Sequence, residues 1–328
     1  AYKDHLAEAT ERGTFSGATL VSKGNRAVFS GAHGYQDREQ GIPNTLDTRF
    51  RIYSMTKMFT AVAVLQLAQQ GKLDIFTPMG QYLPDYPHSE AAQRVTLHHL
   101  LTHTSGLSAE ARLFQANRRT AQTLEDHMAA LGPLGLEFEP GSRWAYTNYG
   151  YLLVGLIVQR VAGQSYYDYV RQHVFERAEM SSSSFEPDAT RDAVGYINGY
   201  FGVPWRRDTG APALAPALPS GGSYSPVEDI RRFAYALMTH RLLDAAHTEL
   251  LTAGKVEAGT LGSRESYGCE EFEAEGVRWF GRSGSGNSGN GELRIYPDSG
   301  YVAIVLANVT SPAAVHTSAY IGDRLPAR

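Results

Sequence analysis

Residues 54–71 read SMTKMFTAVAVLQLAQQG, and the prediction of the fold starts from this stretch. The segment is apolar almost throughout and closes on Gly71, in the position where a helix C-terminus favours glycine. We therefore predict a long helix over residues 54–70. Its first turn holds Ser54-Met55-Thr56-Lys57, the only Ser-x-x-Lys in the chain. At that position the positive end of the helix dipole stabilises negative charge on the Ser54 oxygen.

Ser54 and Lys57 are a candidate nucleophile and its base. A hydroxyl is a weak nucleophile at neutral pH unless a neighbouring group takes its proton, and a desolvated lysine can do so. Lys57 lies three residues after Ser54, so both side chains rise from one helix face. The alternative is a helix-capping serine followed by a solvated lysine, which is the commoner meaning of an isolated motif. The rest of the chain decides between the two.

Composition excludes several classes of protein. The chain has 328 residues, enough for a large core in one domain or two interleaved ones. A net charge of −4 argues against nucleic acid or an anionic membrane surface as the main partner. The single cysteine, Cys269, excludes an internal disulfide framework. We find no apolar run long enough for a membrane span and no signal-peptide pattern. The chain starts at Ala1 rather than Met, which fits removal of a leader by the cell or in cloning. The compartment therefore stays open, with a periplasmic or secreted location slightly favoured over a cytoplasmic one.

Strand patterns at both ends of the chain enclose a mainly helical middle. Near the N-terminus, two apolar runs flank Gly24-Asn25 and predict a β-hairpin. In the middle, helices are predicted over 149–162, 164–177 and 226–240. In the last third, the predicted elements are strands over 266–273, 277–281, 291–296 and 302–308, then a helix over 312–324.

We therefore predict an α/β fold of the α+β type, in which both chain termini form one antiparallel sheet with flanking helices. A mainly helical region is inserted in its middle. The predicted boundaries are 1–75 with 245–328 for the discontinuous sheet domain, and 76–244 for the helical domain. The active site is expected at the interface of the two domains.

Tyr146-Thr147-Asn148 is the second candidate motif. It follows the turn signal Glu139-Pro140-Gly141 and immediately precedes an apolar helix, so a rigid element would hold both polar side chains. A tyrosine near a cationic lysine has its phenolate favoured, and it could then move a proton between Ser54 and a leaving group. Asn148 carries both donor and acceptor, which suits a substrate amide or ester. Tyr196-Ile197-Asn198 has the same spacing, and we interpret Tyr196 as a loop tyrosine.

The third candidate is the glycine-rich run Gly281-Arg282-Ser283-Gly284-Ser285-Gly286, expected at the end of the strand that begins at Val277. Glycines allow a backbone to approach a ligand closely. Residues 284–289 also match the G-x-G-x-x-G pattern of dinucleotide sites. We reject such a site because a strand follows, whereas the pyrophosphate needs a helix N-terminus there.

Other chemistries have weaker support. The chain lacks both the G-x-S-x-G elbow and a P-loop lysine. His99 and His103 lie four residues apart, as in helical zinc sites, but no glutamate follows the first. Capping or loop-bridging histidines are the favoured interpretation. We predict no metal and no cofactor.

Taken in order, these three motifs resemble the serine β-lactamase and penicillin-binding-protein-like family. The resemblance is to the branch that contains class C β-lactamases, D-aminopeptidases and family VIII carboxylesterases. It covers most of the chain. The stretches that carry it are FRIYSMTKMFTAVAVLQL (50–67), VTLHHLLTHTSGL (95–107), EPGSRWAYTNYGYLLVGLIVQRVAGQSYYDYV (139–170), LPSGGSYSPVEDIRRFAYAL (218–237) and ELRIYPDSGYVAIVLAN (292–308).

The resemblance implies a role for each motif. Ser54 would be the acylated nucleophile, Lys57 would help to deprotonate it, and Tyr146 would exchange the proton with the leaving group. The backbone N–H groups of Ser54 and Ser285 would form the oxyanion hole. Such donors are worth about 10²–10³-fold in rate each. Substrate-binding residues implied by the same motifs are Asn148, Arg282, Ser283 and Gly284.

One residue departs from the family pattern. The third triplet normally begins with lysine or histidine, and here it is Arg282-Ser283-Gly284. Arginine is always protonated, so it cannot act as an acid or a base, but it can bind a carboxylate through two hydrogen bonds. Our hypothesis is that Arg282 supplies the positive potential and recognises a substrate carboxylate. The alternative is that its side chain turns to solvent and activity falls.

The leading functional prediction is a serine hydrolase acting on a small ester, amide or short peptide, either an esterase or a D-amino-acid peptidase or amidase. Tyr53 before the nucleophile, and the sequence YSMTK over residues 53–57, favour the esterase branch of the family. Efficient β-lactamase activity is less expected, because deacylation of β-lactams needs a precisely placed water. The alternatives are an acyltransferase that uses the same acyl-enzyme and a non-catalytic binding protein. The acyl pocket is expected to depend on loops 108–120 and 200–222, and the oligomeric state stays open.

Overall fold

The computed structural model describes residues 2–107, 121–197, 205–209, 217–259, 262–310 and 312–326. The chain divides into two compact units. The sheet unit comprises Ala1–Thr56, Phe175–Arg241 and Phe272–Arg328. The helical unit comprises Lys57–Val174 and Leu242–Glu271.

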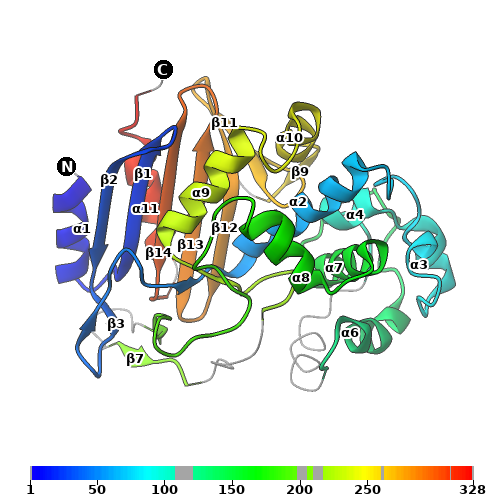
Figure 1. Ribbon diagram of the computed structural model, residues 1–328, viewed down its shortest axis with the longest axis horizontal. Coiled ribbons are helices and arrows are strands. Elements are labelled where there is room, and N and C mark those ends of the chain that lie inside the picture. Colours follow the sequence, from blue (N-terminus) through cyan, green and yellow to red (C-terminus); the bar gives the residue numbers. More distant parts are fainter. Residues whose placement is uncertain are drawn as a thin grey trace. The chain divides into compact units, whose positions relative to one another are not determined.

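The sheet unit joins the two ends of the chain in one antiparallel sheet, as predicted. Its long strands follow the order β2-β1-β14-β13-β12. Strand β1 pairs with β14 from Gly17 opposite Ala307 to Lys23 opposite Tyr301. Figure 1 shows these N-terminal strands in blue beside the orange and red C-terminal ones. The strand bounds are β1 Gly17–Lys23, β2 Arg26–His33, β12 Val277–Gly286, β13 Gly289–Tyr296 and β14 Tyr301–Ala307.

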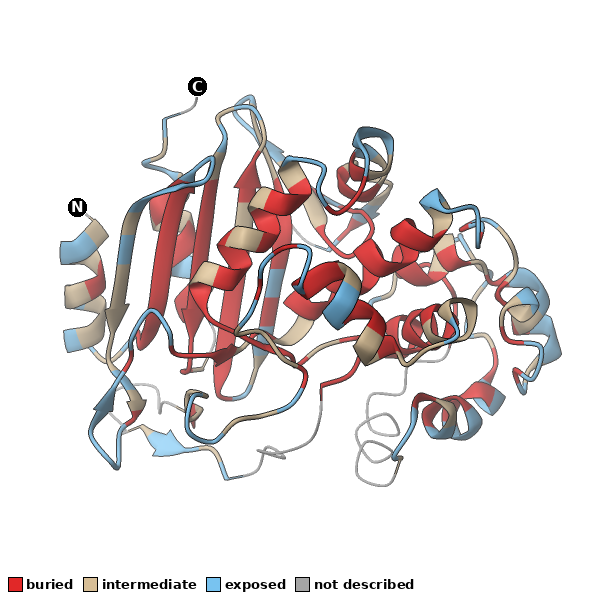
Figure 2. Ribbon diagram, in the orientation of Figure 1, coloured by how far each residue is buried: buried red, intermediate tan, exposed pale blue. Residues whose placement is uncertain are grey.

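Helices cover both faces of this sheet, with α9 in front and α11 behind in Figure 1. Alternate residues of β14 pack with α1 and α11 in one apolar cluster that includes Ala303, Val305 and Ala307. The central strands are buried along most of their length (Figure 2). The helix bounds are α1 Tyr2–Glu11, α9 Val227–Met238 and α11 Ala313–Gly322.

Short two- and three-residue strands complete the sheet unit. They pair as β3 with β4, β5 with β8, and β6 with β7. Their bounds are β3 Tyr35–Asp37, β4 Ile42–Pro43, β5 Phe50–Arg51, β6 Tyr196–Ile197, β7 Arg206–Arg207 and β8 Tyr224–Ser225.

The helical unit is built around α7, which is buried continuously from Tyr149 to Val158. Thr147 caps its N-terminus by accepting the Tyr149 N–H, and Gly163 ends it in the left-handed conformation. The remaining helices are α2 Thr56–Gln69, α3 Ser89–Arg94, α4 Leu97–Leu101, α6 Leu124–Leu131, α7 Asn148–Ala162, α8 Tyr166–Val170 and α10 Ala245–Thr252. Strands β9 Val256–Ala258 and β10 Ser263–Glu265 pair within this unit, and β11 Glu270–Ala274 leads the chain out of it.

Some boundaries differ from the predictions. Helix α9 groups with the sheet unit because it packs on β1 and β14, whereas the predicted helical domain extended to residue 244. Residues 242–271, divided between the predicted domains, group with the helices. The helix predicted over 164–177 is α8 followed by one π-helical turn, Arg171–Phe175. Tyr196 lies in strand β6 and is buried, so its interpretation as a loop residue was wrong.

Candidate functional site

Ser54 lies on a short turn that joins strand β5 to helix α2. The turn is a 3₁₀ segment, Tyr53–Met55, in which the Met55 N–H donates to the Ile52 carbonyl over 3.1 Å. Tyr53 has a φ of 47°, a left-handed conformation that is uncommon for a bulky residue and marks local strain. Thr56 Oγ1 donates to the Tyr53 carbonyl over 2.8 Å. Ser54 is therefore presented, half-buried, on a strained and braced turn.

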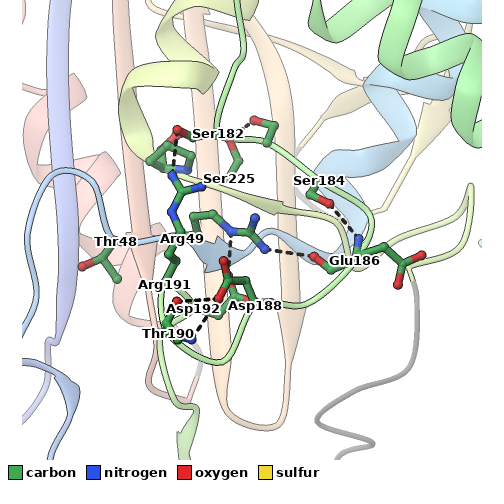
Figure 3. Close-up of polar contacts among 12 residues, drawn as sticks. Thr48, Arg49, Ser182, Ser184, Glu186, Asp188, Thr190, Arg191, Asp192 and Ser225 are labelled. Atoms are coloured by element: carbon green, nitrogen blue, oxygen red, sulfur yellow. Dashed lines mark hydrogen bonds and ion pairs between the residues drawn. The ribbon is translucent and has the colours of Figure 1, made fainter.

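The strand that leads into this turn is anchored by Arg49. Its Nε donates to Asp192 over 2.7 Å and its Nη2 to the Glu186 carbonyl over 2.9 Å (Figure 3). The backbone pairs as well, since the Ala193 N–H donates to the Arg49 carbonyl over 2.8 Å. Burial raises the pKa of the Asp192 carboxyl, and the Arg49 charge opposes that shift. These contacts hold the residues before Ser54 in place.

Strand β12 packs directly against the turn that carries Ser54. A Cβ atom built on Gly284 would lie 2.3 Å from the Ile52 oxygen and 2.8 Å from the Ser54 nitrogen. One built on Gly286 would lie 2.3 Å from the Tyr53 ring. The glycines therefore permit a backbone approach that no other residue allows. The sheet unit thus brings the 284–285 segment beside the Ser54 N–H.

The glycine-rich run lies within a strand. It was predicted at the end of a strand over 277–281, but β12 continues to Gly286 and pairs with β13 throughout the run. Gly281 is required by this pairing, because its Cβ would lie 1.8 Å from the Leu293 oxygen. Ser283 and Ser285 are exposed, and Gly284 between them is buried.

Arg282 is buried, with only 4% of its surface exposed. The alternative in which its side chain turns to solvent is therefore wrong. Its register partner on β13 is Leu293, which in turn pairs with Ile304 on β14. The strand alternates, so the Arg282 side chain is on the opposite face from those of Ser283 and Glu292.

The helical unit gathers the other predicted residues around Lys57. Lys57 is fully buried, and its Nζ donates to Asn148 Oδ1 over 2.7 Å. The same nitrogen lies 4.9 Å from the centre of the Tyr146 ring and 5.3 Å from that of Tyr151. Both distances are typical of cation–π contacts. Tyr146 is 38% exposed, and its hydroxyl donates to the same Asn148 oxygen over 3.4 Å.

Sequence reasoning missed Tyr151 and understated His103. Tyr151 lies one turn into α7 and reads as one more apolar residue of that helix. His103 was considered only as a metal ligand or loop bridge. It bridges loops, because its Nδ1 accepts the Thr147 N–H over 3.3 Å. His99 caps α4 by accepting the Thr96 N–H, which confirms the capping interpretation.

A cavity of about 430 Å³ lies beside Tyr53 within the sheet unit. Phe50, Arg51, Tyr224 and Ser288 line it, and Ser54 is not among its lining residues. The acyl pocket was predicted to depend on loops 108–120 and 200–222. The first of these loops, and residues 198–204 and 210–216 around the second, lie outside the described residues.

The described ranges contain no group of three or more histidine, cysteine, aspartate or glutamate residues that could hold a metal ion. Over the same ranges, every helix is too short or too polar to cross a membrane.

Comparison with known proteins assigns relatives along the whole chain. The family model described as Beta-lactamase matches residues 3–327. The putative penicillin-binding protein PbpX of Bacillus subtilis is 29% identical over 272 residues, which cover 80% of this chain and 63% of that protein. For Penicillin-binding protein 4* of the same organism, the match covers 38% of its length. The chain thus spans less than two thirds of these curated relatives.

Solved structures share the fold over nearly the full chain. A penicillin-binding protein from Bacillus halodurans superposes with a TM-score of 0.86 at 30% identity, covering 98% of this chain and 100% of that one. D-amino acid amidase from Ochrobactrum anthropi has a TM-score of 0.82 at 22% identity, covering 98% and 95%. EstCE1, described as a hydrolase with promiscuous acyltransferase activity, has a TM-score of 0.83 at 21% identity, covering 98% and 96%. At 22% and 21% identity, the amidase and EstCE1 show only that the fold is shared.

Proposed function

This chain belongs to the β-lactamase family, and from that premise we propose that it is a serine hydrolase that forms an acyl-enzyme on Ser54. The observation that carries the proposal is the setting of Lys57, which is fully buried against Asn148 and two tyrosine rings. Removal from water disfavours the charged ammonium, so a buried lysine is more often neutral, and free to take a proton, than a solvated one. Three peptide links hold the Ser54 and Lys57 Cα atoms within about 11 Å of each other.

The proposed reaction has two steps. Ser54 Oγ attacks the substrate carbonyl carbon while Lys57 takes the hydroxyl proton. The carbon–oxygen or carbon–nitrogen bond to the leaving group then breaks, and Tyr146 passes its proton to that group and takes over the proton held by Lys57. The negative oxygen of the tetrahedral intermediate binds to the backbone N–H groups of Ser54 and Ser285. Water then attacks the carbonyl carbon of the acyl-enzyme and gives a proton to Lys57. The bond from that carbon to Ser54 Oγ breaks, the serine oxygen takes the proton back, and the acid is released.

The proposed substrates are small carboxylic esters or amides, including short peptides. The fold neighbours include an amidase and a hydrolase with promiscuous acyltransferase activity, which supports acyl transfer without choosing between ester and amide substrates. Asn148 directs its carbonyl oxygen to Lys57, so its NH₂ group is the part suited to donate to a substrate carbonyl. Ser283 and Ser285 are exposed on β12, the segment along which a substrate would lie, next to Gly284.

We place Arg282 as the source of positive potential in this site. Its burial supports a fixed role, since a guanidinium is always charged and its electrostatic effect is stronger away from water. We expect Arg282→Ala to lower kcat/KM, and to lower it more for an ester that carries a carboxylate than for a neutral one. Equal kcat/KM values for variant and wild type on both esters would contradict this role.

Covalent labelling tests the function. A fluorophosphonate probe is expected to add to wild-type protein and not to Ser54→Ala, with the added mass located on Ser54 by peptide mass spectrometry. Parallel assays with p-nitrophenyl esters, D-amino-acid p-nitroanilides and nitrocefin then identify the bond type. Lys57→Met is expected to lower the labelling rate by about 10²–10⁴-fold, the usual contribution of a general base.

The same assays separate the two alternatives. Product transfer to an added alcohol or amine, in place of release as free acid, would identify an acyltransferase. If no probe labels the protein while its far-ultraviolet circular dichroism spectrum shows a folded chain, the hydrolase proposal is wrong. That result would favour a non-catalytic binding protein. Position 282 is arginine, where the family pattern has lysine or histidine. This departure is the observation that supports the binding-protein alternative.

A further inference from the structure

His103 lies against the segment that carries Tyr146, and we propose that it is a positioning residue for the proton transfer to the leaving group. In this role His103 holds the Tyr146 ring, and Glu265 holds His103. The inference rests on the proposed hydrolase function, because Tyr146 is the group that delivers the proton there.

Two backbone contacts tie the neighbours of Tyr146 to this one residue. The Ala145 N–H donates to the His103 carbonyl over 2.8 Å. The Thr147 N–H donates to His103 Nδ1 over 3.3 Å. Residues 145 and 147 are therefore both fixed to His103, and Tyr146 between them has little freedom to turn at its backbone.

The imidazole of His103 also packs against the Tyr146 ring itself. The His103 ring centre lies 4.4 Å from that of Tyr146, with the two planes inclined at 39°. It also lies 5.2 Å from the centre of the Tyr151 ring. His103 is fully buried, whereas Tyr146 is 38% exposed. The packed imidazole therefore limits the motion of the Tyr146 ring, which also contacts Lys57 and Asn148.

The Glu265 carboxylate faces the other ring nitrogen of His103. Because Nδ1 accepts a hydrogen bond from Thr147, the neutral imidazole carries its proton on Nε2. That nitrogen lies 3.8 Å from Glu265 Oε1, and both side chains are fully buried. The Trp144 indole donates to the other carboxylate oxygen over 3.3 Å. Glu265 thus contacts both His103 and the residue two before Tyr146.

The backbone of His103 is in an energetically unfavourable conformation. Its φ is 57°, in the left-handed region that non-glycine residues seldom adopt. Such a conformation is unfavourable for a non-glycine residue and persists where the surroundings impose it. Its carbonyl accepts the Ala145 N–H and its ring accepts the Thr147 N–H, and these two contacts help to hold the conformation here.

The leaving group provides a readout that separates positioning from general damage. An alkoxide leaves only when it is protonated, whereas 4-nitrophenolate leaves without a proton. Losing the support of Tyr146 should therefore slow ethyl acetate far more than 4-nitrophenyl acetate. Both esters transfer the same acetyl group, so kcat/KM compares the acylation step alone.

We choose His103→Asn as the main variant, because asparagine adopts the left-handed conformation readily and its Oδ1 can still accept the Thr147 N–H. The expected result is a fall of about 10²-fold in kcat/KM for ethyl acetate and of less than about 10-fold for 4-nitrophenyl acetate. Tyr146→Phe should give the same pattern, and the double variant should be no worse than Tyr146→Phe. Glu265→Gln, which keeps an acceptor for Trp144, should give a smaller loss in the same direction.

His99→Asn is the matched control. His99 also accepts a backbone N–H at 3.3 Å through Nδ1, and it does so in the cap of α4. This variant should lose thermal stability without changing the ratio of the two kcat/KM values. Equal losses on both esters in His103→Asn and Glu265→Gln would overturn the positioning role and leave the hydrolase standing. If wild type hydrolyses neither ester, the proposed function fails and this inference fails with it.

Discussion

Gly284 illustrates how one residue sets the distance between two segments of the site. A side chain there would meet the Ile52 oxygen at 2.3 Å and the Ser54 nitrogen at 2.8 Å. Both neighbours are backbone atoms, which cannot rotate away as a flexible side chain would. The absence of a Cβ therefore allows β12 and the Ser54 turn to touch.

We predict that Gly284→Ala destabilises the protein by about 3 kcal/mol, because overpacking against backbone forces both segments apart. It should also lower the labelling rate of Ser54. Gly31→Ala is the control: its Cβ would lie 3.4 Å from the His33 side chain, an ordinary contact. Denaturant unfolding measures both variants. A Gly284→Ala protein as stable as Gly31→Ala would contradict the close approach.

At the scale of an element, the short helix α4 carries two half-buried histidines, His98 and His99. His98 Nδ1 is hydrogen-bonded to the Tyr267 hydroxyl at 2.8 Å, and the Phe76 ring lies 5.4 Å away. Burial lowers the pKa of His98 to about 4, and the positive charges of His99 and Lys255 add to the shift. The imidazole is therefore neutral in the folded protein at pH 7.

This shift predicts an acid sensitivity of the helical unit. The unfolded chain binds a proton at His98 near pH 6.5, and the folded chain binds it only near pH 4. Stability from this group is therefore complete above pH 6.5 and is lost as the pH falls toward 4. His98→Gln should reduce that loss by about 1–2 kcal/mol, allowing for solvent screening. Unfolding free energies at pH 7.5 and pH 4 test it; an unchanged difference would refute it.

At the scale of the whole molecule, the sheet depends on strands from opposite ends of the chain. Strand β1 lies between β2 and β14, so residues 17–33 complete a sheet whose other long strands, β12, β13 and β14, begin after residue 276. Pairing over so long a separation forms late and is expensive in chain entropy. The core of the sheet unit is thus incomplete until both ends of the chain are present.

We therefore expect a chain lacking residues 2–33 to lose cooperative unfolding, because β14 would become an exposed hydrophobic edge. A shorter deletion, of residues 2–12, removes α1 with its one buried residue, Leu6. That control should still unfold cooperatively at a lower midpoint. Circular dichroism with thermal unfolding distinguishes the two. A sharp transition in the longer deletion would show that the sheet does not need its N-terminal hairpin.

Several features were predictable from local pattern. The turn at Gly24-Asn25 was predicted, and the strands end at Lys23 and resume at Arg26. The Ser54 helix and the α7 helix were found within a few residues of their bounds, because long apolar runs leave few alternatives. The glycines of β12 were assigned to a strand end, because glycine has low strand propensity. The close approach of Leu293, Ile52 and Tyr53 explains why they lie inside the strand.

The sequence by itself determined the family, the sheet shared by both termini and the three motifs with their order, because these depend on residue type and spacing. Only the tertiary structure decided that Lys57 lies against the Tyr146 and Tyr151 rings and that Arg282 is buried. It also decided that His103 is hydrogen-bonded to the residue after Tyr146. Burial and ring packing arise from residues distant in the chain. The contact between His103 and Thr147 spans 44 positions, which no local pattern encodes.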